Sequence, residues 1–346
     1  MELRHLAFLT PGSYPPDDPR TGLEAALALI AFGEQLGYDG AWVRHRHLEP
    51  GISSAAVFLA AASQHTRRIE LGTAVIQLGY ETPFRLAEDL SLLDALAGAR
   101  LQVGVSTGAP PFAELLGPLL FDTDPARIDF SHARVLRLIE ALQGNALGTE
   151  EVRVGNAASL YRPRLQPFAP GLAQRVWYGA GSLESARWAG LHGLHLLLGN
   201  VNRAESHDDF VAAQLQHLAV YRAALPAQAS PRIAAGRVVV PTDGVDAATR
   251  RRLLDFAAQR RARTESPQGP RRTMFAPDVV GSTAQIVDAL SADPVLQQVN
   301  ELRVELPYEL PAGDYRRILQ TIVERVAPAL GWQAQPQSAQ RLRAAP

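Results

Sequence analysis

A short polar segment, residues 44–49 (RHRHLE), carries the side chains best suited to acid–base chemistry. It directly follows residues 40–43, an apolar run typical of a short buried strand. An imidazole titrates near neutral pH and can exchange a proton with a ligand that a neighbouring guanidinium polarises. We therefore predict His47 and Arg46 as catalytic residues and expect His45 to point away from the ligand. The alternative is an ionic cluster within this segment that only holds a surface loop.

A glycine-containing turn, Gly179-Ala180-Gly181-Ser182, lies between an apolar run and a stretch with helical periodicity. Such a turn at a helix N-terminus directs backbone N–H groups and the helix dipole towards an anion. Hydroxyl groups of Ser182 and Ser185 can add further donors. We predict a phosphate site at Gly179, Ala180, Gly181, Ser182 and Ser185. The alternative is an ordinary strand-to-helix turn in which Ser182 caps the helix.

Two further positions could contact the same ligand. Ser106 and Thr107 end another apolar run between two glycines, so that backbone and hydroxyl groups could approach a phosphate together; the alternative is a simple strand end. Arg134, in a predicted helix, could pair with a phosphate through two parallel hydrogen bonds. The alternative for Arg134 is a solvated helix face.

The composition excludes several kinds of chemistry. Cysteine is absent, which excludes disulfides, thiolate catalysis and cysteine-ligated metals. All 34 basic residues are arginine, so a lysine Schiff base or a phosphate-loop lysine is impossible. The net charge of −1 argues against a nucleic-acid partner. The nine histidines show no spacing typical of a metal site, and we predict none.

No apolar run approaches the ~20 residues that span a bilayer, and the first residues lack the pattern of a signal peptide. We therefore expect a cytoplasmic protein without a membrane partner.

Eight apolar runs, most of them followed by a stretch with helical periodicity, organise the chain. The runs are residues 5–9, 40–43, 69–76, 101–105, 175–178, 194–198, 233–240 and 302–306. The predicted helices are 22–36 (capped by Thr21), 55–64, 83–97, 130–143, 183–189, a helix within 205–225, 246–263, 284–292 (capped by Ser282) and 314–330. Continuously apolar strands alternating with helices are typical of a parallel sheet covered on both faces.

This alternation predicts the α/β class and a (β/α)8 TIM barrel with insertions after strands 4 and 7. The first insertion comprises a surface loop at 106–125 and a strand pair at 150–161; the second ends in a polar loop at 264–277. We expect one domain over residues 1–335 and a flexible tail over 336–346. Active sites of such barrels lie at the C-terminal ends of the strands, where the residues discussed above fall.

The sequence resembles the luciferase-like, flavin-dependent monooxygenase family, the group that includes bacterial luciferase. The resemblance spans nearly the whole chain and is most specific between residues 69 and 94. The matching residues are Gly37-Tyr38-Asp39-Gly40-Ala41-Trp42-Val43, Arg46-His47-Leu48, Leu71-Gly72-Thr73-Ala74-Val75, Pro83, Leu86-Ala87-Glu88-Asp89, Leu93-Asp94, Arg100, Arg134, Gly179 to Ser182, Trp188-Ala189 and Gly281-Ser282.

The resemblance implies a site for reduced FMN (FMNH2), with its phosphate at Arg134, Ser182, Ser185 and the end of strand 4. It also implies that the flavin ring lies over Thr73, Ala74 and Val75, with a non-proline cis peptide at Ala74–Val75. Two departures are visible. Arg46 replaces the first of two adjacent histidines that the family often carries, and Ser106-Thr107 stands where many members have an arginine.

The implied function is a monooxygenase that uses reduced FMN and O2 on a small organic substrate, with His47 and Arg46 orienting and protonating the oxygen intermediate. A separate flavin reductase would supply the reduced cofactor, because no nicotinamide motif is present. Two alternatives stay open: an F420-dependent hydride-transfer enzyme on the same barrel, and a flavin-binding protein without turnover. The alanine-rich helix 55–64 and the apolar helix 83–97 predict a homodimer across these helices.

Overall fold

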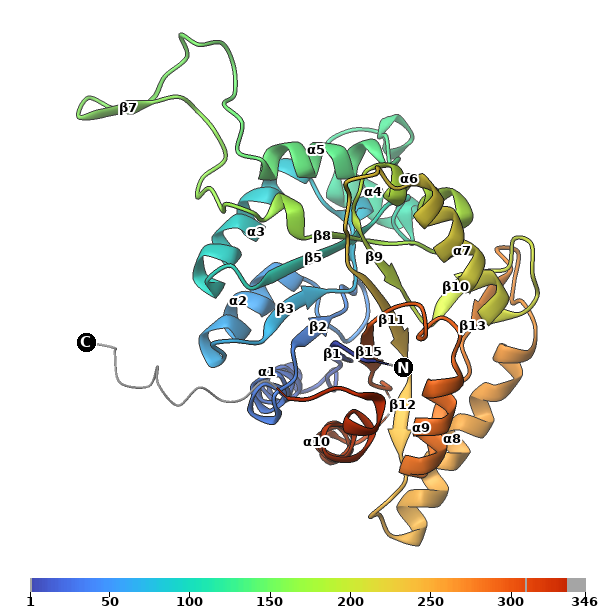
Figure 1. Ribbon diagram of the computed structural model, residues 1–346. Helices are drawn as coiled ribbons and strands as arrows, with labels where there is room; N and C mark the ends of the chain where they lie inside the picture. Colours follow the sequence, from blue (N-terminus) through green and yellow to red (C-terminus); the bar gives the residue numbers. More distant parts are fainter. Residues whose placement is uncertain (1, 309, 335–346) are drawn as a thin grey trace.

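A computed structural model describes residues 2–308 and 310–334 of the chain. Eight parallel strands form a closed barrel, because the last strand pairs with the first and β3 pairs with β5 (Figure 1). The barrel strands are β1 (His5–Thr10), β2 (Gly40–Val43), β3 (Glu70–Thr73), β5 (Leu101–Ser106), β8 (Val176–Gly179), β9 (His195–Leu198), β11 (Ile233–Arg237) and β15 (Glu301–Glu305). The predicted (β/α)8 barrel is therefore confirmed.

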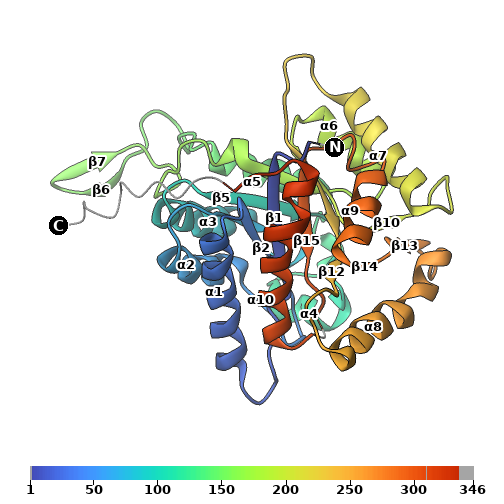
Figure 2. The ribbon, with the colours of Figure 1, turned by 60° about the horizontal axis from the view of Figure 1, so that its bottom comes forward.

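Helices surround the barrel and cover its outer face (Figure 2). They are α1 (Pro19–Leu36), α2 (Ala55–His65), α3 (Pro83–Ala97), α5 (Ala133–Leu142), α6 (Leu183–Leu191), α7 (Phe210–Ala224), α9 (Thr283–Ala292) and α10 (Ala312–Thr321). A π-helical turn (Ile322–Val326) and a 3-10 turn (Pro328–Leu330) continue α10. The predicted cap at Thr21 is wrong. Asp18 caps α1 and accepts the Thr21 N–H, because Pro19 supplies a first helical residue with a fixed φ.

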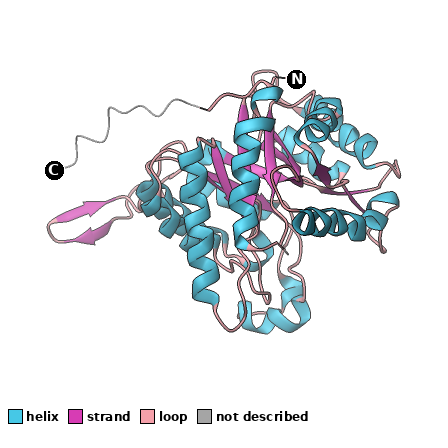
Figure 3. Cartoon of the chain, turned by 90° about the horizontal axis from the view of Figure 1, so that it is seen from below, coloured by secondary structure: helices cyan, strands magenta, loops and turns pink. Residues whose placement is uncertain are grey.

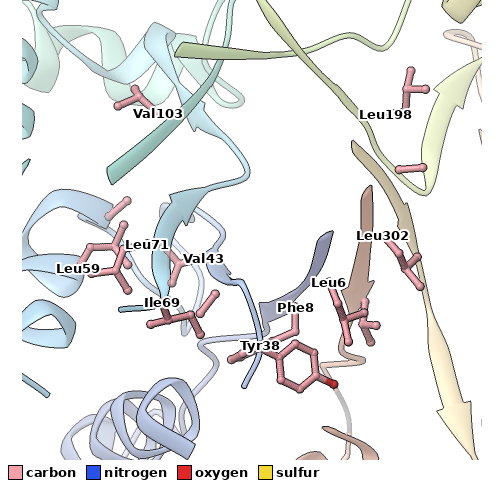
Figure 4. Close-up of a cluster of buried hydrophobic side chains, with 14 of the residues drawn as sticks. Leu6, Phe8, Tyr38, Val43, Leu59, Ile69, Leu71, Val103, Leu198 and Leu302 are labelled. Carbon is pink, nitrogen blue, oxygen red and sulfur yellow. The ribbon is translucent and has the colours of Figure 1, made fainter. Parts of the chain in front are cut away.

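The main hydrophobic core lies between the barrel wall and the helices. Leu6, Phe8, Val43, Leu71 and Val103 point outwards from their strands into this layer, where they are completely buried (Figure 4). Alternate residues of the strands point into the barrel, as the pleat requires. The core behind the barrel wall and the apolar residues inside the barrel are thus two separate hydrophobic clusters.

Two tryptophans fill the barrel interior. The rings of Trp42 and Trp177 meet edge to face, with centroids 5.5 Å apart and planes at 88°. A Cβ atom on Gly72 would lie 2.2 Å from Cδ2 of Trp42, so the strand needs glycine there to admit the indole. The centre of the barrel is therefore a packed core, and ligands must bind at its mouth.

Insertions follow β5 and β11, as predicted. The first contains α4 (Ala113–Leu120), a 3-10 turn (Pro125–Arg127) and a hairpin of β6 (Val154–Asn156) and β7 (Ser159–Tyr161) that projects from the barrel (Figures 1 and 2). The hairpin confirms the predicted strand pair. The expectation of a loop without structure at 106–125 is wrong, because it contains α4; Gly117 and Pro118 interrupt the helical pattern of its sequence. Another 3-10 turn (Ala173–Arg175) precedes β8.

The second insertion lies between β11 and α9 and builds small sheets beside the barrel mouth. β12 (Val239–Pro241) pairs with β14 (Val279–Gly281), and β13 (Thr273–Phe275) pairs with β10 (Val201–Arg203), which follows β9. The long helix α8 (Ala247–Glu265) connects β12 to β13. The predicted strand 233–240 is thus two strands that break at Val238, and the predicted loop 264–277 includes β13.

Figure 3 shows the helices arranged around the sheet from below. The predicted tail at 336–346 lies outside the described residues. Within residues 2–308 and 310–334, no helix combines the length and the apolar character needed to cross a bilayer.

Candidate functional site

The carboxyl ends of the strands bring most of the predicted residues to one end of the barrel. β2 and β3 run in register, so that Val43 lies opposite Thr73, and the Ala74 N–H donates to the Val43 carbonyl at 2.8 Å. The segment carrying Arg46 and His47 therefore begins beside the segment predicted to hold the flavin ring.

His47 lies in a cluster of three rings at this end of the barrel, together with His45 and Tyr80. Its ring stacks on Tyr80, with centroids 3.8 Å apart and planes 20° apart, and His45 packs against it edge-on at 4.2 Å. The Nε2 atom of His47 is buried and has no hydrogen-bond partner among the described residues. Burial lowers the pKa of His47, so the imidazole is neutral at pH 7 and can serve a ligand as donor or acceptor.

His45 belongs to this cluster, contrary to the expectation that it points away. Its Nε2 atom lies 2.7 Å from the Ser53 carbonyl oxygen and 3.6 Å from Oε1 of Glu81. Burial and the neighbouring His47 lower the pKa of His45 to about 4. Burial and the charge of Asp89 raise the pKa of Glu81 to about 7, so this carboxyl group can hold a proton at neutral pH.

Arg46 turns towards the end of β15. Its guanidinium donates to the Tyr308 hydroxyl at 2.8 Å, and another nitrogen lies 3.4 Å from the Glu49 carboxylate. The ion pair between Arg46 and Glu49 shows that the ionic cluster considered as an alternative is present. It lies in the same segment as His47, the predicted acid–base residue. Arg44 forms a partly buried ion pair at 2.5 Å with Glu305, which lies three residues before Tyr308 in the sequence.

The segment Thr73 to Val75, predicted to lie against the flavin ring, has the predicted cis peptide; we call it the platform. The predicted strand 69–76 divides into β3 and a short β4 (Ile76–Gln77), and the bond between them at Ala74–Val75 is cis, as predicted. Thr73 is buried, donates to the Gly104 carbonyl at 2.8 Å and accepts from the Gly104 N–H at 2.9 Å. Ala74 and Val75 are half-buried over the tryptophan layer and leave a small apolar surface.

At the end of β5, Ser106 and Thr107 are half-buried. The Thr107 hydroxyl hydrogen-bonds with the hydroxyl of Tyr178, on the neighbouring strand β8, at 2.9 Å. Thr107 thus faces the side of the mouth where β8 leads into the turn before α6.

In the turn before α6, Ser182 and Ser185 form a capping box. The Ser182 hydroxyl accepts the Ser185 N–H at 3.2 Å, and the Ser185 hydroxyl accepts the Ser182 N–H at 3.1 Å. The next donor, the Leu183 N–H, binds the Glu205 carboxylate at 2.5 Å. The alternative in which Ser182 caps the helix is therefore present in the structure. The Glu205 carboxylate lies at the helix N-terminus, where a phosphate was predicted.

Arg134 is buried in α5 and lies on the other side of the platform. Its Nε donates to the Leu78 carbonyl at 3.1 Å, and another of its nitrogens donates to the Glu81 carbonyl. The acceptors belong to the first residue of the 3-10 turn Leu78–Tyr80, which carries the ring stacked on His47, and to the residue that follows this turn. In this structure Arg134 therefore holds that turn in place.

Sequence reasoning missed several residues of the site. Tyr80, Glu81 and Tyr308 all follow strand ends, which is the signal that identified His47; Glu205 gave no signal because it lies far along the chain from the turn it reaches. Among residues 2–308 and 310–334, no cluster of three histidine or acidic side chains could hold a metal ion.

Comparison with known proteins places this barrel in a family. The family model for the luciferase-like monooxygenases matches residues 1–314. The chain belongs to the luciferase-like monooxygenase family.

Among relatives in this family, the chain is 36% identical over 219 residues to 4-hydroxyprotoasukamycin monooxygenase of Streptomyces nodosus subsp. asukaensis. That match covers 61% of this chain and 57% of the relative's own length. It is also 35% identical over 105 residues to limonene 1,2-monooxygenase of Rhodococcus erythropolis, covering 30% of this chain and 27% of the relative.

Solved structures share the luciferase-like fold at low identity. The oxygenating constituent of 3,6-diketocamphane monooxygenase of Pseudomonas putida, in complex with FMN, superposes with a TM-score of 0.68 at 16% identity and covers 95% of this chain and 98% of that one. An F420-dependent secondary alcohol dehydrogenase superposes with a TM-score of 0.61 at 14% identity, covering 95% and 99%. At these identities the likeness shows the fold alone.

Proposed function

We propose that the protein is a monooxygenase that binds reduced FMN and uses it with O2 on a small organic substrate. The observation that carries this proposal is the Nε2 atom of His47, which is buried beside the Ala74–Val75 platform and has no hydrogen-bond partner in the part of the chain that the structure describes. A buried imidazole nitrogen that lacks a partner costs free energy, which a ligand at the mouth recovers by hydrogen bonding to it. The named activities of the relatives agree with this reading.

The residues at the platform fit a flat aromatic ring. Ala74 and Val75 are half-buried and apolar, and the Thr73 hydroxyl fixes their strand to β5. A flat apolar surface whose backbone is held on both sides suits a ring that gains its binding energy by burial. Thr73 would act by holding the platform, because its hydroxyl is already hydrogen-bonded in both directions.

The phosphate would bind at the N-terminus of α6, near Gly179, Ala180, Gly181, Ser182 and Ser185. The hydrogen bond from the Leu183 N–H to the Glu205 carboxylate supports this proposal, because it pairs a negative charge with a free backbone donor at the start of the helix. Ser106 and Thr107 would offer hydroxyl groups from β5. The Nε and one terminal nitrogen of Arg134 already donate to the Leu78 and Glu81 carbonyls, so a contact with the phosphate would use the remaining N–H groups of its guanidinium.

Reduced FMN, when bound, supplies the electrons that activate O2. The protein's own residues then supply position and protons. Neutral His47 would hydrogen-bond through Nε2 to the reacting atoms, and Arg46 would stabilise developing negative charge from the Tyr308 side. Glu81, with its pKa of about 7, is placed beside His45 to return a proton to the cluster.

The test is an anaerobic titration of the purified protein with photoreduced FMN, followed by rapid mixing with O2. We expect saturable binding of reduced FMN, and flavin reoxidation on the protein with kinetics that differ from those of free FMNH2. Absence of binding would refute the proposal. A separate flavin reductase would supply FMNH2 in the cell, and its omission from a coupled assay should stop turnover.

F420 is the second candidate cofactor, favoured by the shared barrel of the F420-dependent alcohol dehydrogenase. Parallel titrations with oxidised F420 and FMNH2 separate the two, since an F420 enzyme would reduce or oxidise its substrate without O2. A protein that binds flavin without turnover would show binding of reduced FMN and no substrate-dependent oxygen consumption.

A homodimer across α2 and α3 is a further proposal. These helices expose large apolar side chains, namely Val57, Phe84, Leu92 and Leu96. Contiguous exposed apolar surface of this kind is typical of protein–protein interfaces. Light scattering should give twice the monomer mass, and Leu96→Arg should shift it towards the monomer.

A further inference from the structure

An apolar cavity of about 690 Å³ lies between α1 and α10, which run side by side (Figure 2). Its walls include Tyr14, Ala25, Leu29, Leu310 and Tyr315; we name it the α1–α10 slot. Small residues line its α1 side, at Gly22, Ala25, Ala26 and Ala28. A slot with aromatic residues on one side and small residues on the other suits an extended apolar body.

The slot begins beside the predicted catalytic residues. Thr10, at its inner end, pairs in register with Val43, the last residue before the Arg46–His47 segment. Tyr308 lines the slot and accepts the hydrogen bond from Arg46. Tyr308 therefore belongs to the wall of the slot and also contacts Arg46.

A second cavity, of about 710 Å³, runs along α8 and shares Leu310 with the slot. Its walls carry Arg251, Arg252, Arg260, Asp255 and Phe256; we name it the α8 groove. In Figures 1 and 2, α10 lies between α1 and α8, in agreement with the shared wall.

The α8 groove has an excess of positive charge. Helix α8 contains six arginines, Arg250, Arg251, Arg252, Arg260, Arg261 and Arg263, against two acids, Asp255 and Glu265.

Two of the groove arginines also have acidic partners outside the helix. Arg252 pairs with Asp314 at 2.7 Å and Arg260 with Asp278 at 2.6 Å, but both carboxylates are largely buried behind their guanidinium groups. Arg251 is exposed and forms no ion pair with any residue in the described part of the chain.

We infer that the slot and the groove together bind a substrate with an extended apolar body and an anionic head. The body would occupy the α1–α10 slot with its reactive end near Tyr308 and Arg46. The head, a phosphate or a carboxylate, would pair with Arg251 and its neighbours in the α8 groove. Guanidinium groups match both anions through paired hydrogen bonds. This inference names the substrate class of the proposed monooxygenase and rests on that proposed function.

The two parts make separable contributions to affinity. Each methylene buried in the slot contributes hydrophobic free energy, so that removal of two methylenes should weaken binding about tenfold. The pairing with Arg251 is electrostatic, partly exposed and screened by salt. Affinity for the anionic ligand should therefore fall as salt rises, while affinity for a neutral analogue should not.

The test is calorimetric titration of the flavin-free protein with octyl phosphate, hexyl phosphate and 1-octanol. We expect octyl phosphate to bind about tenfold more tightly than either of the others at low salt. Arg251→Glu should remove its advantage over 1-octanol, and Arg251→Gln, a milder change at the same exposed position, should remove most of it. Arg153→Glu, on the β6–β7 hairpin side of the molecule, is the matched control and should change nothing.

The slot is tested separately. Ala25→Trp places an indole in it from an exposed position and should weaken octyl phosphate and 1-octanol alike; Ala223→Trp, on the exposed face of α7, is its control.

Equal binding of octyl phosphate and 1-octanol by the wild type would overturn the inference, as would no effect of either Arg251→Glu or Ala25→Trp. Because these titrations contain no flavin, failure here leaves the anaerobic titration with reduced FMN unaffected. Loss of FMNH2 binding in the wild type would instead remove the proposed function and leave this ligand site standing.

Discussion

The imidazole of His47 stacks on the phenol ring of Tyr80, with centroids 3.8 Å apart. The Tyr80 hydroxyl donates to the Pro111 carbonyl at 3.1 Å, so the loop after β5 fixes the ring on which the imidazole rests. The carbonyl groups on either side of Tyr80 are held by Arg134. The position of His47 therefore depends on two neighbouring segments, and Tyr80 is a positioning residue for it.

Replacement of His47 by asparagine should lower kcat by about a hundredfold, the range typical of a lost acid–base group, while binding of reduced FMN stays within a few-fold. Stopped-flow kinetics with photoreduced FMN would measure both quantities. An unchanged kcat would exclude His47 from catalysis. His207→Asn, at an exposed histidine distant in sequence, is the control.

Replacement of Tyr80 by alanine should lower kcat about tenfold, since stacked pairs contribute about 0.5–1.5 kcal/mol. It should also expose His47 and return its lowered pKa towards the ordinary value, which would move the acidic limb of the pH–rate profile upwards. Tyr80→Phe keeps the stacked ring and loses only the hydrogen bond to Pro111, so it should keep most of the wild-type kcat and the wild-type pH profile. If Tyr80→Ala lowers kcat but leaves the pH profile in place, the ring has only a structural role.

Glu81 should make stability depend on pH. Its folded-state pKa of about 7 lies above its ordinary 4.5, so the folded protein binds the extra proton and its stabilising contribution is complete below pH 4.5. That contribution is lost as pH rises through about 7. Glu81→Gln mimics the protonated form and removes the dependence. The Tm of the variant minus that of the wild type should therefore increase between pH 5 and pH 8, as thermal denaturation would show.

Glu88→Gln, in the neighbouring helix α3, where the Glu88 carboxylate pairs with Arg85, is the control for this measurement. A difference in Tm that stays constant from pH 5 to pH 8 would contradict the raised pKa of Glu81.

Glu205 should compete with the FMN phosphate. Its carboxylate accepts the Leu183 N–H at the start of α6, and binding of a phosphate there would bring two negative charges together. Glu205→Gln should therefore strengthen FMN binding about tenfold at low salt. Equilibrium titration by flavin fluorescence would measure the change.

Asp208→Asn, a nearby exposed acid in the same segment, is the control and should have little effect. Weaker FMN binding by Glu205→Gln would mean that the carboxylate supports the phosphate site instead of occupying it.

The barrel was predictable because its strands are buried on both faces and read as continuous apolar runs. The apolar pattern does not show where one strand ends and another begins within a single run. Residues 233–240 were predicted as one strand, yet the chain leaves the barrel at Val238 to form β12. Helix α4 was hidden for the opposite reason, since its Gly117 and Pro118 are typical of loops.

The place of His47 at the barrel mouth was predictable because it follows a strand end, and the cis bond at Ala74–Val75 was predictable from the family pattern. Contacts between distant segments could not be predicted. Nothing near Arg134 in sequence indicates that it binds the Leu78 carbonyl, and nothing near Leu183 indicates Glu205. Such pairs depend on how the loops pack over the barrel mouth, which local periodicity does not encode.

The buried carboxylate of Glu305 gives a final prediction. It pairs with Arg44 and accepts the Asn200 N–H at 3.3 Å, and a Cβ atom on Gly236 would lie 2.0 Å from its Oε1. Gly236→Ala should therefore push Glu305 out of place and destabilise the fold by about 1–3 kcal/mol, the usual cost of overpacking. Gly313→Ala, in the first turn of α10 with nothing within 4 Å, should leave stability unchanged within about 0.5 kcal/mol or raise it slightly.

Urea denaturation at pH 7 measures both glycine variants. Because Arg44 loses its partner when Glu305 moves, Gly236→Ala should also impair turnover more than its stability loss explains. Equal stabilities of the two variants would show that Glu305 can rotate away at little cost in free energy. The Arg44–Glu305 ion pair would then not be required for the stability of the fold.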